Sequence, residues 1–137
     1  MTASLLEDEI WSRIRIDPQS LPVGKVSIVP STIISRLLHR PVRAEEAEAS
    51  LSPADQSLEI MVYQLHYPEA KRTLKIHFEK NFPHTILEWE ESYPGISWGT
   101  ESKTLHTRAK LKKTLLLDYW RQNQLEDRRL REALGLS

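Results

Sequence analysis

The sequence of 137 residues contains no cysteine and only four glycines, and its nineteen basic side chains are balanced by nineteen acidic ones. The lack of cysteine excludes disulfides, thiolate nucleophiles and metal sites with cysteine ligands. A formal net charge of zero provides no whole-molecule attraction to nucleic acid or to an anionic membrane. The glycines form no nucleotide-binding fingerprint, and the sequence contains no G-x-S-x-G nucleophile motif.

Long apolar runs are also missing. No segment approaches the roughly 18 apolar residues that span a bilayer, so we expect no transmembrane segment. The opening MTASLLEDEIW has neither the basic region nor the apolar core of a signal peptide. We therefore expect either a cytoplasmic protein or a fragment whose targeting segment lies upstream. The composition, 39% hydrophobic and 28% charged, is typical of one globular domain spanning residues 1–137.

Both ends of the chain carry helical patterns. Ser4 and Glu7 have the spacing of a capping box. Behind them, apolar residues recur every four positions at Leu6, Ile10 and Ile14. This pattern predicts an amphipathic helix over residues 5–14. Residues 115–134 are rich in helix formers and form the second predicted helical segment.

The region between them, residues 25–112, is predicted to be rich in strands. In RTLKIHFEK, one face carries Leu74, Ile76 and Phe78, and TILEWEE returns as its hairpin partner. SLEIMVYQLHY is apolar on both faces, which indicates a covered strand, whereas TIISRLLH fits either a strand or a helix. We expect an α+β fold: a twisted antiparallel sheet of five or six strands, or a half-barrel sheltering an apolar ligand, with the two helices on it or at its ends.

An acidic pair is the first candidate for chemistry. Glu88 and Glu90 lie two apart on a predicted strand, roughly 6.5–7 Å between their Cα atoms, which overlaps the separation that glycoside hydrolases need between their carboxyl groups. The predicted hairpin places Lys75 and His77 on the same face, so cross-strand ion pairing explains the carboxylates without catalysis. We predict no catalytic residue, and keep a carbohydrate-active enzyme using these two glutamates as the alternative.

Aromatic and histidine side chains are the remaining candidates. Trp89 faces the apolar side of the hairpin, which predicts a core position. Tyr93 and Trp98 flank the Pro94–Gly95 turn and are the predicted binding residues. The five histidines form no H-x-x-x-H or H-x-x-E-H motif, so we predict no metal site, and no other motif calls for a cofactor.

Several stretches carry a resemblance: LEDEIWSRIRIDPQSLPVG, IVPSTIISRLLH, YPEAKRTLKIHFEKNFPHTILEWEE and the closing YW…LREALGL. In this order they resemble the C-terminal half of an uncharacterised exported protein family of Bacteroidetes, sometimes labelled a septum formation protein. The chain has none of the Ser-Pro-Arg-rich motif of the septum-formation pyrophosphatases, so that label is unsupported. The resemblance implies a cell-envelope location and transfers no activity.

Taken together, these features favour a non-enzymatic cell-envelope module that binds an apolar small molecule or a protein partner and no nucleic acid. A purely structural domain of a larger protein is a further alternative. The sequence does not determine the oligomeric state.

Overall fold

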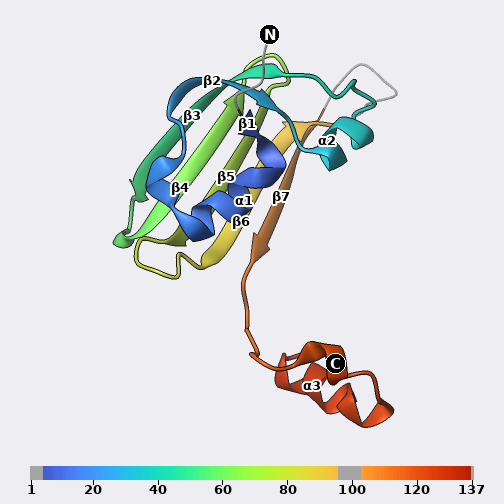
Figure 1. Cartoon of the computed structure of the whole chain (residues 1–137). Coiled ribbons are helices and arrows are strands. Elements are labelled where there is room, and N and C mark those ends of the chain that lie inside the picture. The colour runs from blue at the N-terminus through green and yellow to red at the C-terminus, as the bar shows by residue number, and fades with distance from the viewer. Residues whose placement is uncertain (1–4, 96–102, 137) are drawn as a thin grey trace.

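The computed structural model describes residues 5–95 and 103–136. It is an α+β fold built on one seven-stranded sheet whose strand order follows the chain (Figure 1). The strands are β1 (Leu5–Leu6), β2 (Gly24–Val29), β3 (Glu45–Ala54), β4 (Ser57–Tyr67), β5 (Arg72–Glu79), β6 (Ile86–Pro94) and β7 (Thr104–Lys110). The helical elements are α1 (Glu7–Ile16), η1 (Pro18–Ser20), α2 (Thr32–Leu37), η2 (Tyr119–Arg121), η3 (Leu125–Arg128) and α3 (Arg129–Ala133).

The α+β class is confirmed, but the predicted five or six antiparallel strands are corrected to seven in a mixed, open sheet. The first two residues of the predicted helix form β1, which pairs parallel to β2, while all later pairs are antiparallel. The physical reason is burial: Leu5 is 2% exposed beside Ile28, whereas Leu6, predicted to face the core, is 51% exposed.

One face of the sheet, the inner face, carries the hydrophobic core. Its buried strand residues are Val26, Ile28, Ala47, Ala49, Tyr63, Leu65, Tyr67, Leu74, Ile76 and Phe78. Helix α1 lies across this face and packs into the same cluster through Ile10 and Ile14 (Figure 1). On the opposite, outer face of β4, Ile60 and Val62 are only partly buried and Leu58 is 75% exposed, so the prediction that β4 is covered on both sides was wrong.

The β5–β6 hairpin forms as predicted, with one irregularity. Trp89 lies opposite Ile76 and packs against the core, as the alternation predicts. The register shifts between His77 and Phe78, so Phe78 pairs with Ile86, which also packs against the core. Because this bulge adds one residue to β6, Ile86 does not share a face with Glu88, contrary to the strict alternation expected from sequence.

Helices α1 and α2 are joined by polar contacts at their N-terminal ends. The Leu6 amide donates to the Glu9 carboxylate at 3.2 Å, while the predicted cap residue Ser4 lies outside the described residues. The ambiguous TIISRLLH segment forms α2 because β2 ends before Pro30. At the start of α2, the Thr32 amide and hydroxyl donate to the Asp8 carboxylate at 3.3 and 3.0 Å.

Residues 115–136, here called the C-terminal arm, lie apart from the sheet at the end of an extended link, residues 111–114 (Figure 1). The arm contains η2, η3 and α3 rather than one long helix. Tyr119 and Trp120, the aromatic residues of η2, are 75% and 64% exposed. Among the described residues, no helix is both long enough and apolar enough to cross a membrane.

Candidate functional site

A buried ionic network joins α1 to the sheet. Arg72 of β5 donates two hydrogen bonds to the Glu7 carboxylate, both at 2.6 Å, and a third to Glu91 of β6 at 2.5 Å. The Tyr67 hydroxyl also donates to Glu7 at 2.6 Å. Arg72 and Glu7 are each only 2% exposed. A buried guanidinium needs this degree of pairing, because an unpaired buried charge is strongly unfavourable.

The network fixes the charge states of its members. Burial lowers the pKa of Arg72, but hydrogen bonds and attraction from Glu7 and Glu91 outweigh this, so its pKa is raised. Burial raises the pKa of Tyr67, and the adjacent Glu7 carboxylate raises it further. Arg72 therefore stays protonated and Tyr67 stays neutral at physiological pH, and the rigid cluster serves as the floor of a surface depression.

That depression, here called the inner hollow, has a volume of about 410 Å³ and lies between α1, the start of α2 and strands β5 and β6. It is lined by Glu7, Asp8, Trp11, Ser31, Ile33, Ile34, Arg72, Leu74, Trp89 and Glu91. Its lining carries three carboxylates and one guanidinium, so the hollow is formally negative.

Two tryptophans, Trp11 and Trp89, form part of the wall of the inner hollow. The rings of Trp11 and Trp89 lie with their centroids 6.2 Å apart and their planes at 82°, an edge-to-face pair. Both rings are only partly buried. Perpendicular indoles beside carboxylates attract a cation through its charge and through the negative ring faces, and they contact the apolar atoms next to that charge.

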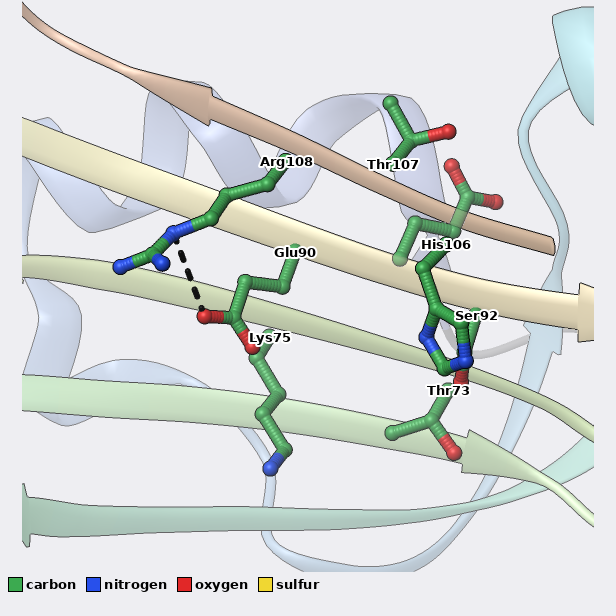
Figure 2. Close-up of a pocket in the computed structure, with 8 residues that line it drawn as sticks. Thr73, Lys75, Glu90, Ser92, His106, Thr107 and Arg108 are labelled. Atoms are coloured by element: carbon green, nitrogen blue, oxygen red, sulfur yellow. Dashed lines mark ion pairs between the residues drawn. The ribbon is translucent and has the colours of Figure 1, made fainter.

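The outer face of β5, β6 and β7 holds a second depression, of about 380 Å³ (Figure 2). Here His106 reaches toward Thr73 and Ser92, and Arg108 approaches Glu90 at 3.6 Å. Lys75 and Glu90 are cross-strand neighbours, as are His77 and Glu88. This outer depression mixes both signs of charge on an open sheet surface.

Glu88 and Glu90 both face outward, as predicted, but their ionic partner is Arg108 of β7. A hydrogen bond from Arg108 lowers the pKa of Glu88. A glycoside hydrolase needs one carboxyl group with a raised pKa to act as the acid. Sharing one arginine thus favours an ion-paired surface over the alternative of a catalytic pair.

Of the two predicted binding residues, Tyr93 and Trp98, the structure describes only Tyr93. Tyr93 is part of β6 rather than of a loop, and it lies opposite Leu105 on the same face as Trp89 and Glu91. It is partly buried and does not line the inner hollow. Trp98 lies outside the described residues.

Sequence reasoning missed Trp11 and the partners of Arg72. One signal was available: Glu7 and Trp11 are four apart and flank Ile10 and Ile14 on the buried side of α1. A carboxylate on an apolar stripe requires a buried cationic partner, but the identity of that partner depends on sheet register.

No protein family, curated protein or solved structure matches the chain. The function is therefore inferred from the geometry of the hollow.

Proposed function

We propose that this chain is a non-enzymatic protein-binding module, and that the inner hollow receives a cationic side chain flanked by apolar residues on a protein partner. The observation that supports this most directly is the perpendicular Trp11–Trp89 pair beside the carboxylates of Asp8 and Glu91. The resemblance to exported proteins adds a cell-envelope location to the proposal.

The composition of the hollow favours such a segment over a purely apolar ligand. Ile33 and Leu74 provide apolar contacts, and Ile33 is 69% exposed, so apolar surface is available at the rim. An uncharged hydrocarbon ligand would leave Asp8, which forms no ion pair with any described residue, without a cationic partner, whereas Glu7 and Glu91 already pair with Arg72. A guanidinium or ammonium group satisfies Asp8 and lies against the indoles, which stabilises a bound cation by about 0.5–2 kcal/mol.

A small cation probe tests the hollow directly. N-acetyl-arginine methylamide is titrated into the isotopically labelled full chain, and the citrulline analogue, which has the same shape without the charge, is the matched ligand. Binding worth about 4 kcal/mol corresponds to a Kd of about 1 mM, which NMR detects. We expect the indole signals of Trp11 and Trp89 to shift with the arginine derivative and to stay unmoved by citrulline.

Variants identify the groups responsible. Asp8→Asn keeps an oxygen that accepts from Thr32 but removes the charge, and Trp11→Leu removes one aromatic wall while keeping an apolar side chain. Both should weaken the arginine response severalfold. Glu46→Gln removes a carboxylate that pairs with Lys25 away from the hollow, and it should change nothing. Equal shifts with citrulline, or an unchanged response in Asp8→Asn and Trp11→Leu, would overturn the proposed function.

A further inference from the structure

The C-terminal arm exposes an unusual amount of apolar surface. Its exposed large hydrophobic residues are Leu116, Leu117, Tyr119, Trp120, Leu125 and Leu136. Leu116 is fully exposed and Leu125 is 77% exposed. A segment of this size and short helix length does not form a stable core alone. The arm therefore requires a surface to cover it, and contiguous exposed apolar residues of this kind mark binding surfaces.

The arm also carries unpaired cations. Arg128, Arg129 and Arg131, at the junction of η3 and α3, are exposed and form no ion pair with any residue that the structure describes. Leu130 lies between them and is half-buried. This segment has the chemistry that the inner hollow is proposed to take, with guanidinium groups flanked by leucine. The inner hollow, in turn, is negative and apolar.

The last strand directs the arm away from its own sheet. β7 runs from Thr104, opposite Pro94, to Lys110, opposite Glu88, and the Leu111 amide then donates to the Leu87 carbonyl. The chain thus leaves the sheet at the end away from α2, whose first residues line the inner hollow (Figure 1). The extended link then carries the arm away from its own sheet, so the arm leaves its own inner hollow uncovered (Figure 1).

We propose that two copies of this chain exchange arms, so that the η3–α3 segment of each arm places an arginine in the inner hollow of the other copy. This inference rests on the proposed function, because it names the partner of that same site. Such an exchange is reciprocal and closes as a two-fold dimer, in which each hollow is completed by the second copy. The exposed residues of the arm then cover the rim that Ile33 leaves open.

Complementation between two full-length variants tests the exchange. The arm variant carries Arg128→Gln, Arg129→Gln and Arg131→Gln, and the hollow variant carries Asp8→Asn and Trp11→Leu. By analytical ultracentrifugation, we expect the wild type to dimerise and each variant alone to dissociate at least about tenfold more readily. An equimolar mixture should recover heterodimers, because one arm and one intact hollow remain. A charge-matched control with Lys25→Gln, Arg43→Gln and Lys75→Gln should dimerise like the wild type.

A wild type that stays monomeric, or a mixture that recovers no heterodimer, would overturn arm exchange. The arginine probe separates this failure from failure of the proposed function, because the arm variant keeps an intact hollow. If its Trp11 and Trp89 signals shift with N-acetyl-arginine methylamide while the wild type is monomeric, the hollow binds a different protein. If the probe moves no indole signal in the arm variant, the proposed function fails as well.

Discussion

At the scale of single residues, Arg72 is the buried cation that compensates the negative charges of Glu7 and Glu91. It is held between Glu7 and Glu91 and is 2% exposed, while the Tyr67 ring lies 5.1 Å below its guanidinium carbon. A buried ion pair contributes little net stability compared with a well-packed apolar alternative. Removal of one partner, however, leaves the others buried without compensation.

We therefore expect Arg72→Met to lower the free energy of unfolding by about 3–5 kcal/mol in urea titrations. Arg43→Met is the matched control, since Arg43 forms only an exposed ion pair with Glu69 at 3.7 Å. Its loss should cost less than about 1 kcal/mol. Similar losses in the two variants would show that the Arg72 network does not hold α1 to the sheet.

Tyr63 is predicted to make stability depend on alkaline pH. Burial raises the pKa of its hydroxyl to about 12, although Arg13 lowers it slightly, and the hydroxyl donates to the Pro22 carbonyl at 2.9 Å. In the unfolded chain the pKa of tyrosine is about 10. The folded state therefore holds the proton more tightly, so stability is fully present below pH about 10 and falls as pH rises toward about 12.

A two-unit difference in pKa corresponds to about 2–3 kcal/mol across this window. Tyr63→Phe should therefore flatten the decline in urea-unfolding free energy between pH about 9 and 11.5. A decline remains from Tyr67, whose pKa is also raised by burial. Parallel pH profiles for the variant and the wild type would contradict the assignment to Tyr63.

At the scale of elements, α1 belongs to the core of the sheet. Ile10 and Ile14 are fully buried, whereas Ile16 at the end of the same helix is 79% exposed. The sequence pattern left open whether this helix lies on the sheet or at its end. The answer lies in the cluster that Ile10 and Ile14 share with β2 to β5.

This pair of isoleucines provides a matched test of α1 docking. Ile14→Ala should destabilise the protein by about 2–4 kcal/mol, because it removes buried methyl groups and leaves a cavity. Ile16→Ala should change stability by less than about 0.5 kcal/mol, as exposed substitutions usually do. Chemical denaturation of both variants measures the difference. An equal loss of stability in Ile16→Ala and Ile14→Ala would show that α1 does not dock on the sheet through the face that carries Ile14.

At the scale of the whole molecule, the chain consists of a sheet with α1 packed on it and an arm joined to it by one extended link (Figure 1). Lys112 and Lys113 lie in this link and are exposed, outside any helix or strand. Exposed, extended segments with few contacts are the preferred sites of limited proteolysis.

Brief digestion with trypsin should therefore release the arm and leave a fragment ending at Lys112 or Lys113, identified by intact-mass spectrometry. Lys112→Gln with Lys113→Gln should abolish this fragment, while Lys25→Gln on β2 should leave it unchanged. The link stays accessible in the proposed exchange, because only the arm beyond it enters the second copy. Absence of the fragment from the wild type would show that the link is covered.

Much of the fold was predictable from local patterns. Strict alternation identified β5, because successive strand residues point to opposite faces, and it correctly assigned Trp89 and the outward Glu88 and Glu90. Periodicity at four residues identified α1 for the same kind of reason. These features depend only on residues that are close together in the sequence, so the local sequence pattern is sufficient to predict them.

What the sequence alone did not determine required contacts between distant residues. The parallel pairing of β1, the bulge beside Ile86 and the Arg108 partner of the outer glutamates all depend on sheet register. The inner hollow is the clearest case, because its tryptophans are 78 residues apart and meet only after α1 crosses β6. Local periodicity thus determines which side chains are buried. Only tertiary packing decides which buried side chains contact one another, because contacts between distant residues leave no pattern in the local sequence.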